Sequence, residues 1–246
     1  MAWWMAHLRL GEAVLSDLPA REGLDEAMYY AGCVAPDCGR RVERPGQRAV
    51  YMPDRPATHW VDSNDKWDEP IHFERFYDQY LRVPSVYKGQ YAWRGLKTAR
   101  TVFSSSTCRQ QAFVLRPCPR RAFYWGYYVH LLTDALWIEL GMRAFIGRGG
   151  EWNRDLRRRM KRDALAWEQG FYRAHPDYPP LQKLEGVQRL GFDPMGLPEA
   201  LILSRLQGVR PAYEGERAEA QIIAPEEYER ALDRMIHLAR MVIRGK

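Results

Sequence analysis

Apolar residues recur every three or four positions along most of the chain, which is the period of an amphipathic helix. Strict alternation of apolar and polar residues, which is typical of half-buried strands, is suggested only by TVFSSST at 101–107. The pattern predicts helices at about 5–18, 24–32, 71–82, 121–140, 151–174, 196–207 and 225–244. The fold class that follows is all-α.

Proline, glycine and arginine are concentrated between these helices, at 36–58, 83–120 and 175–195. Two of the three segments exceed about 20 residues, which is long for a structureless connection in a compact domain. Such segments are usually functional or contain short elements of their own. We expect a single domain over 1–246, a helical bundle with long loops across one end, in which 151–246 form a C-terminal helical portion.

Composition is that of an ordinary globular protein, with 46% hydrophobic and 28% charged residues and a formal charge of +6. The basic residues form no tail and do not alternate regularly with aromatics, so nothing indicates nucleic-acid binding. The densest basic run, RRRMKR at 157–162, lies in a predicted helix. It is either a solvated helix face or a patch that attracts phosphate groups or anionic lipid.

The N-terminal sequence MAWWMAHLRLGEAVL has neither the long apolar core nor the cleavage site of a secretory signal. The only candidate membrane span, 122–138, is at the lower length limit and carries Asp134 near its middle. The four cysteines, at 33, 38, 108 and 118, form no C-x-x-C pair. We therefore expect a soluble, cytoplasmic protein with reduced thiols.

The stretch GYYVHLLTDALW at 126–137 looks like a core helix, yet it contains a histidine and an aspartate. Between Arg121 and Glu139 only His130 and Asp134 can carry a charge. Their i, i+4 spacing puts both side chains on one helical face, and Gly126, one turn earlier, leaves room above the imidazole. A buried carboxylate needs a partner, which is either a structural hydrogen bond to the histidine or a metal ion that binds both.

Three further candidate ligands occur in apolar or tightly turned settings. His7 lies within the first predicted helix, Asp37 follows Pro36 in YYAGCVAPDCG, and His59 ends the proline-rich MPDRPATH. Each also has a structural interpretation, as a hydrogen-bonded core histidine or, for the aspartate, as a turn residue or helix cap. Mixed histidine and aspartate ligation is nevertheless typical of zinc.

The order of these motifs resembles that of the zinc-dependent phospholipase C family, including its intracellular bacterial members. The resemblance spans roughly 5–140 and comprises His7, APD ending at Asp37, TH ending at His59 and GYYVHLLTD with His130 and Asp134. It implies the helical fold of phospholipase C and P1 nuclease, and it marks Asp37 as catalytic. It also implies one zinc bound by Asp37, His59, His130 and Asp134, and a second zinc bound by His7, with Asp134 bridging the two.

A carboxylate bridge allows two cations to lie about 3.5–4 Å apart, where a shared water loses a proton near neutral pH and can attack phosphorus in line. The resemblance thus implies a metal-dependent phosphoester hydrolase (a phosphodiesterase) that acts on a phosphodiester or a phospholipid. The aromatic segment VPSVYKGQYAW at 83–93 could make a peripheral contact with a membrane surface or pack on the bundle.

The chain departs from the secreted members of that family in its ligand set. Those enzymes use the amine of an N-terminal tryptophan, whereas Trp3 and Trp4 here are internal. The ligands of a third zinc are absent at the expected spacing, since only Glu139, His175 and His237 remain downstream. One or two ions are therefore expected. The alternative function is a non-catalytic binding or scaffold protein with a structural metal, and zinc nucleases rank lowest because D-x-H-Q-P-x-H is absent.

Overall fold

The all-α class is confirmed in a computed structural model of the chain. The structure describes residues 4–19, 21–42, 50–63, 68–82, 118–143, 146–147, 152–208 and 213–246. These residues are mostly helical, and their only strands are an antiparallel pair, β1 (Arg40–Val42) and β2 (Val50–Met52), in which the backbone of Arg41 is in register with that of Tyr51. None of the helices in these ranges is long and apolar enough to cross a membrane.

Each of the seven predicted helices corresponds to a helix of the structure. They are α1 (Trp4–Leu15), α2 (Glu26–Val34), α4 (Phe73–Tyr80), α7 (Pro119–Leu136), α9 (Arg154–Ala174), α11 (Glu199–Gln207) and α13 (Pro225–Arg244). Side-chain caps set two of the starts: Asp25 accepts a hydrogen bond from Met28 N at 3.1 Å, and Asn153 accepts one from Leu156 N at 2.9 Å. The predicted helix at 121–140 is α7 followed directly by the π-helix η4 (Trp137–Met142).

Two of the predicted loops contain short elements, as their length suggested. The first holds the 3₁₀ turn η1 (Ala35–Cys38), the strand pair and α3 (Arg55–His59), which Asp54 caps by accepting from Ala57 N. The segment 175–195 holds α10 (Pro179–Glu185) and the start of the 3₁₀ turn η5 (Pro194–Gly196). The suggested strand at 101–107 and the aromatic segment 83–93 lie outside the described residues.

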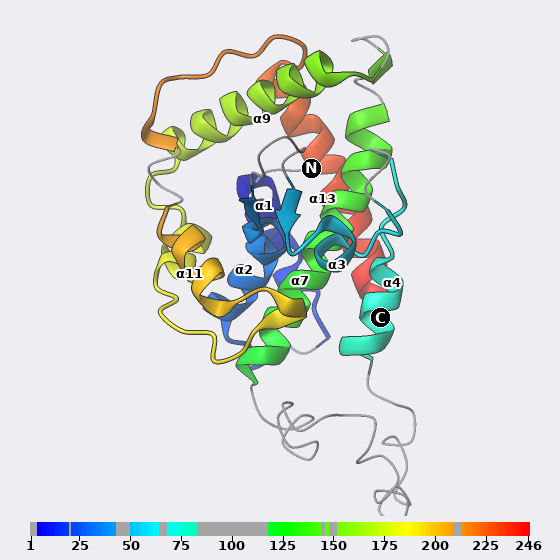
Figure 1. The fold of residues 1–246 in the computed structure, drawn as a ribbon, viewed down its shortest axis with the longest axis vertical. Coiled ribbons are helices and arrows are strands. Elements are labelled where there is room, and N and C mark those ends of the chain that lie inside the picture. The colour runs from blue at the N-terminus through cyan, green and yellow to red at the C-terminus, as the bar shows by residue number, and fades with distance from the viewer. Residues whose placement is uncertain are drawn as a thin grey trace, which may run out of the picture.

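The centre of the fold is the close packing of α2 against α7 (Figure 1). Glycines allow the two backbones to touch: a Cβ built on Gly126 would lie 1.9 Å from Tyr29 O, and one on Gly32 would lie 2.0 Å from Phe123 O. The sequence interpretation of Gly126, that it leaves room above His130, therefore gave the wrong reason. Glycine is required at position 126 because the backbone of α2 occupies the space that a side chain would need.

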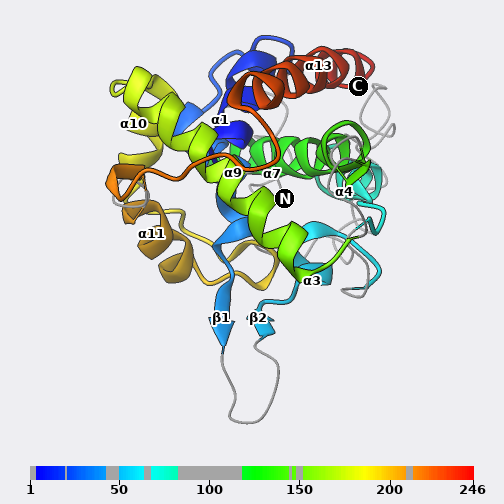
Figure 2. The ribbon, with the colours of Figure 1, turned by 90° about the horizontal axis from the view of Figure 1, so that it is seen from above.

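The C-terminal portion packs on the same core as the N-terminal helices. Buried apolar residues from Met5 to Ile243 form one cluster, and α9 passes over α1 and α7 (Figure 2). Trp167 of α9 stacks on Tyr228 of α13 with ring centroids 4.7 Å apart. Helix α13 in turn contacts α1, where the Arg240 guanidinium donates to Ala13 O at 2.9 Å. Helix α1 is thus enclosed by elements from both ends of the chain.

The expectation of reduced thiols is only partly correct. Cys33 and Cys38 are free and buried, whereas Cys118 is disulfide-bonded. A disulfide requires only that two cysteines approach closely in space, so the absence of a C-x-x-C pair did not exclude one.

Candidate metal centre

All five predicted ligands converge on one place in the structure. His7 comes from α1, Asp37 from η1, His59 from the end of α3, and His130 and Asp134 from α7. Their donor atoms form two overlapping groups, each with all atoms within 4.8 Å of one another: His7, Asp37 and His130, and His59, His130 and Asp134. The three histidines and Asp134 are buried, while the Asp37 side chain retains 16% of its exposure.

Each imidazole turns Nε2 towards a carboxylate. His7 Nε2 lies 3.7 Å from Asp134 Oδ1, His59 Nε2 lies 3.7 Å from Asp134 Oδ2, and His130 Nε2 lies 3.9 Å from the same Oδ2. These separations are too long for hydrogen bonds. They are close to the distance of about 3.3–3.6 Å between neighbouring ligands of a tetrahedral zinc ion with bonds of 2.0–2.2 Å.

The protonation of His130 follows from its hydrogen bond to α2. Its Nδ1 lies 2.8 Å from Cys33 O, and a carbonyl oxygen can only accept, so Nδ1 carries the hydrogen. In the neutral ring Nε2 therefore presents a lone pair, and this atom has no hydrogen-bond partner among the described residues. The structural interpretation, a hydrogen bond from His130 to Asp134, does not fit this geometry.

His59 is fixed in the same way by its neighbour. Its Nδ1 lies 2.8 Å from Thr58 Oγ1, and the Thr58 hydroxyl donates its only hydrogen to Asp54 O at 3.2 Å. The hydroxyl oxygen must then accept from Nδ1–H, so Nε2 of the neutral ring also carries a lone pair. That lone pair faces Asp37 Oδ1 at 3.2 Å. Two acceptors at this distance need a cation or a proton between them.

Burial and charge set the protonation states of the cluster. Burial lowers the pKa of His130 to about 3, and the adjacent His7 adds to the effect. Burial also lowers the pKa of His7 itself. Burial would raise the pKa of Asp37 and of Asp134. For Asp37 the hydrogen bond with a protonated His59 outweighs this effect, and for Asp134 the attraction of nearby positive charge outweighs it, so both pKa values are lowered. Neutral imidazoles and charged carboxylates are the forms that bind metals.

His7 differs from the other two histidines because nothing orients its ring through a hydrogen bond. Neither ring nitrogen has a hydrogen-bond partner in the described part of the chain, which argues against a hydrogen-bonded core histidine. The ring stacks on His130 with centroids 3.8 Å apart and an interplanar angle of 11°. Its position therefore depends on this stacking and on where α1 begins.

The downstream candidates do not join the cluster. Glu139 is exposed and pairs with Arg143 at 3.1 Å. His175 follows the end of α9, where its ring lies 4.6 Å from that of Phe171, and His237 is exposed on α13.

A buried acid next to the start of α1 was missed by the sequence reasoning. Glu168 of α9 is fully buried, and its Oε1 accepts a hydrogen bond from Met5 N at 2.5 Å. Burial raises the pKa of this carboxyl to about 8. The signal was available, because Glu168 is the only charged residue in the apolar run at 164–172, just as His130 and Asp134 are exceptional in theirs.

The basic run of α9 lies apart from these five residues in the sequence and surrounds a shallow cavity. This cavity, of about 210 Å³, is lined by Arg158, Arg159, Arg162 and Gln221. Arg158 is 80% exposed and pairs with Asp155 at 2.7 Å. Both interpretations of the run, a solvated face and a patch for phosphate groups, remain compatible with this arrangement.

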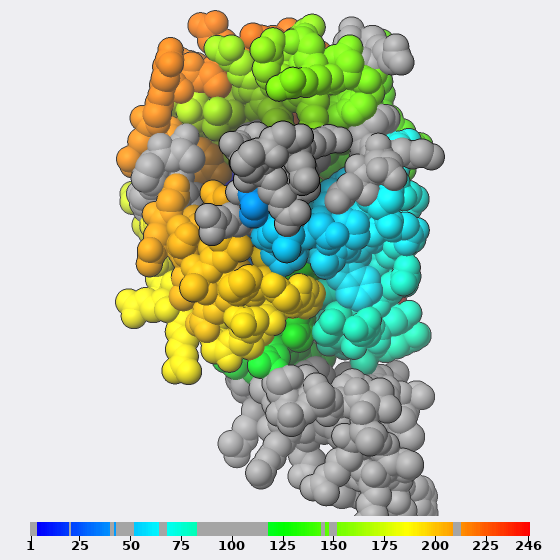
Figure 3. Space-filling model, viewed as in Figure 1, coloured from blue at the N-terminus to red at the C-terminus, as the bar shows by residue number. Residues whose placement is uncertain are grey.

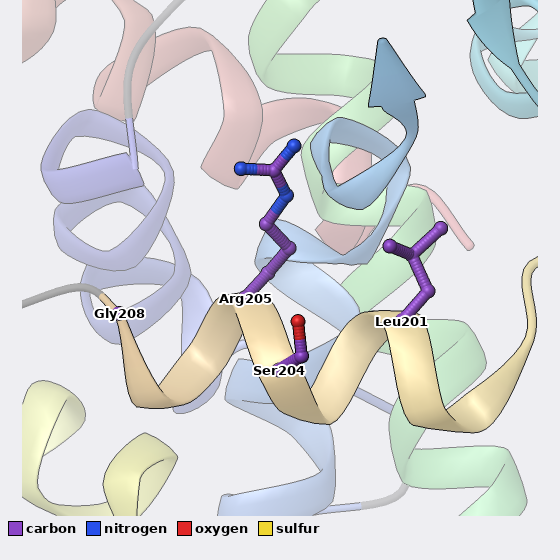
Figure 4. A pocket seen from close by; sticks show the side chains of 4 residues that line it. All are labelled: Leu201, Ser204, Arg205 and Gly208. Atoms are coloured by element: carbon purple, nitrogen blue, oxygen red, sulfur yellow. The ribbon is translucent and has the colours of Figure 1, made fainter. Parts of the chain in front are cut away.

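A larger cavity lies on the element that packs against η1. Helix α11 contacts η1, and a cavity of about 440 Å³ on α11 is lined by Leu201, Ser204, Arg205 and Gly208 (Figure 4). Burial and Asp37 raise the pKa of the Cys38 thiol, and Arg205 lowers it, so both charges lie near this thiol. Helices α11 and α3 both contact η1, and both lie on the face of the molecule seen in Figure 3.

No family model, curated protein or solved structure matches the chain. The resemblance to zinc-dependent phospholipase C therefore depends on the order of the sequence motifs. The argument for a metal site depends on the geometry and protonation of the five side chains, which is independent of that resemblance.

Proposed function

We propose that the chain is a metal-dependent phosphoester hydrolase whose cluster of histidine and aspartate side chains binds one or two divalent cations. The observation that carries the proposal is the orientation of His59 and His130. Both rings hold their hydrogen on Nδ1, through Thr58 and through the Cys33 carbonyl, and both turn the Nε2 lone pair towards carboxylates. Orientation of ligand histidines through the second ring nitrogen is the usual arrangement around protein-bound zinc.

The charge balance of the cluster supports a bound cation. Asp37 and Asp134 together bring two negative charges, and the imidazoles around them are neutral where burial lowers their pKa. Buried negative charge without compensation is costly. One divalent cation balances the two carboxylates, and a second would attract an anionic substrate such as a phosphodiester.

The donor types favour zinc among the common cations. Three imidazole nitrogens and two carboxylates suit a borderline cation, whereas calcium and magnesium prefer oxygen ligands alone. Other first-row transition metals accept the same donors. Zinc is therefore the first ion to test, followed by the other transition metals.

A bound zinc ion would supply Lewis-acid chemistry, lowering the pKa of a water molecule and neutralising charge that develops on a phosphoryl group. The chain's own residues would do the rest. Asp37 is the ligand with residual exposure, so a water molecule could approach its carboxylate and give it a proton. Arg205, in the cavity beside η1, would bind a phosphoryl oxygen.

The proposed substrates are phosphodiesters, including phospholipids. The positive charge of Arg205 suits an anionic ester, and the resemblance stated above points to phospholipids within that class. A peripheral membrane contact through 83–93 stays a prediction, because that segment lies outside the described residues.

Metal content and turnover test the proposal together. We expect elemental analysis of the full chain, purified without chelators, to find zinc or another transition metal, and a panel of phosphodiesters and phosphomonoesters to reveal turnover. His130→Ala and Asp134→Ala should lose both. Full metal content in both variants would show that the site is assigned wrongly.

Two buried threonines provide a matched pair for the same assay. Thr58→Val removes the oxygen that accepts from His59 Nδ1, so metal affinity should fall about 10–100-fold. Thr133→Val removes a buried hydroxyl that donates to Val129 O at 2.7 Å within α7, and it should leave metal affinity unchanged. Equal affinities in the two variants would contradict the proposed role of Thr58.

The second candidate function is a non-catalytic binding or scaffold protein with a structural metal. The observation that favours it is the deep burial of four of the five ligands, since structural zinc sites are closed to solvent. Tight metal binding with no turnover of any phosphoester would support this alternative against hydrolysis.

A further inference from the structure

The N-terminal end of α1 has an unusual partner. The first N–H groups of a helix have no acceptor within the helix, and α1 carries no acidic residue in its first turn. The carboxyl of Glu168, 163 residues away on α9, accepts from Met5 N at 2.5 Å. The Ala6 N–H stabilises the charged form of the same carboxyl, so it also acts on Glu168. A side chain of the C-terminal portion thus caps the helix that carries His7.

We propose that Glu168 is a positioning residue for His7, an inference that rests on the proposed metal centre. His7 is two residues beyond Met5, in the first turn of α1, so the cap sets the position of its backbone. His59 and His130 are oriented through Nδ1 by partners of their own, but His7 has no such partner in the described residues. The cap on α1 therefore positions His7, as Thr58 orients His59 and the Cys33 carbonyl orients His130.

The distances show how little movement the site tolerates. His7 Nε2 lies 3.7 Å from Asp134 Oδ1 and 3.9 Å from Asp37 Oδ2, which is near the separation of two ligands on one zinc ion. A shift of about 0.5 Å at the start of α1 would take the ring out of the range that productive sites require. Positioning by a distant carboxyl is therefore enough to decide whether His7 can bind.

Glu168 is suited to this role because its own helix is held on both sides. The preceding residue, Trp167, donates from Nε1 to Glu229 Oε2 at 2.9 Å, and Glu229 also pairs with Arg9 of α1. The following residue, Gln169, accepts from Ala218 N at 2.8 Å. The carboxyl is thus presented to α1 from a fixed backbone, which gives residues 151–246 a defined part in the metal centre.

The chemistry of the carboxyl defines the variants. Glu168→Gln keeps an oxygen that can accept from Met5 N–H, and its amide can still meet the Tyr213 hydroxyl, whose hydrogen bond lowers the pKa of Glu168. Glu168→Leu keeps most of the volume but removes the acceptor. Gln169→Ala is the matched control, because Gln169 is equally buried on the same helix and its hydrogen bonds go to Glu216 and Ala218 rather than to α1.

The experiment measures zinc affinity of the full chain by competition with a chromophoric chelator, together with the visible spectrum of the cobalt-loaded protein. We expect Glu168→Leu to bind zinc tenfold or more weakly and to change the cobalt spectrum, as losses of supporting groups around metal ligands do. Glu168→Gln and Gln169→Ala should both bind as the unmodified chain does. Equal affinities for Glu168→Leu and Gln169→Ala would overturn the proposal, and so would a Glu168→Gln variant as weak as Glu168→Leu.

A second readout separates this inference from the metal site itself. In the metal-free protein the His7 ring stacks on His130, so the NMR shift of its Cε1 proton reports their separation. This shift should move in Glu168→Leu and stay unchanged in Gln169→Ala. If the unmodified chain binds no metal, the proposed function fails while the NMR comparison still decides the role of Glu168. If Glu168→Leu does not fold, Glu168→Asp, which withdraws the oxygen by one methylene, takes its place with the same expected direction.

Discussion

Gly126→Ala is the substitution that should damage the candidate metal centre without touching any ligand. A Cβ at this position would lie 1.9 Å from Tyr29 O and 2.8 Å from Cys33 N, whereas real Cβ contacts essentially never fall below 3.0 Å. Helices α2 and α7 must therefore move about 1 Å apart, a shift that rigid helix packing resists. The hydrogen bond from His130 Nδ1 to Cys33 O, now 2.8 Å, crosses the same contact and would lengthen beyond hydrogen-bonding range.

The magnitude follows from these two effects. Overpacking of a close contact costs about 1–3 kcal/mol, and the lost hydrogen bond costs about 1 kcal/mol more. We expect the free energy of unfolding of the metal-free protein to fall by about 2–4 kcal/mol in Gly126→Ala, as measured by urea denaturation followed by circular dichroism. Because His130 loses the bond that orients its ring, zinc affinity should also fall tenfold or more.

Gly170→Ala is the control for this prediction. Gly170 lies within α9, and a Cβ built there would meet nothing within 4 Å. Alanine is the better helix former, so this variant should gain about 0.5–1 kcal/mol of stability and keep its zinc affinity. If Gly126→Ala unfolds at the same urea concentration as the unmodified chain and binds zinc equally well, the backbone contact between α2 and α7 does not support the site as we infer.

Three further predictions concern buried ionisable groups. The pKa of His130 is lowered from 6.5 to about 3, so the unfolded chain takes up a proton at this group first as the pH falls. Between these two values the metal-free protein should lose up to about 1.4 kcal/mol of stability per pH unit from this group, as measured by urea denaturation. The pKa of Glu168 is raised from 4.5 to about 8, so the unfolded chain releases its proton first and the unmodified protein loses stability as the pH rises from 4.5 to 8. Glu168→Gln has no such proton to lose, so in the same assay it should gain stability relative to the unmodified chain over this range. Asp163 accepts from three backbone N–H groups between 221 and 223, so thermal unfolding should show Asp163→Ala destabilised by about 3 kcal/mol or more, unlike the exposed Asp155→Ala.

The sequence was most informative about elements with a local cause. The helices follow from the spacing of apolar residues, and each of the seven helices predicted in this way is present in the structure. The length of the loops at 36–58 and 175–195 indicated that they contain short elements, but it did not indicate where. A three-residue strand or a single 3₁₀ turn leaves no periodic pattern in the sequence. Their positions depend on tertiary contacts, such as the packing of η1 against α11.

The candidate site was partly visible for a different reason. A charged residue inside an apolar run is costly unless it has a partner, and this criterion identified His130 and Asp134. Glu168 meets the same criterion, because it is the only charged residue in the run 164–172. The groups that orient the rings could not be foreseen, because the Cys33 carbonyl meets His130 only once α2 and α7 have packed.

The three histidines are oriented by contacts that span very different distances along the chain. Thr58 and His59 are adjacent, so their contact needs only α3, whereas the bond from His130 to Cys33 O needs the packing of α2 on α7. The placement of His7 needs α9 docked on α1, which brings together residues 163 positions apart. A full set of metal ligands therefore exists only in the completely folded chain. Since a ligand that binds only the native state stabilises it by mass action, metal binding should raise the stability of the whole protein, including α9, rather than that of α3 and α7 alone.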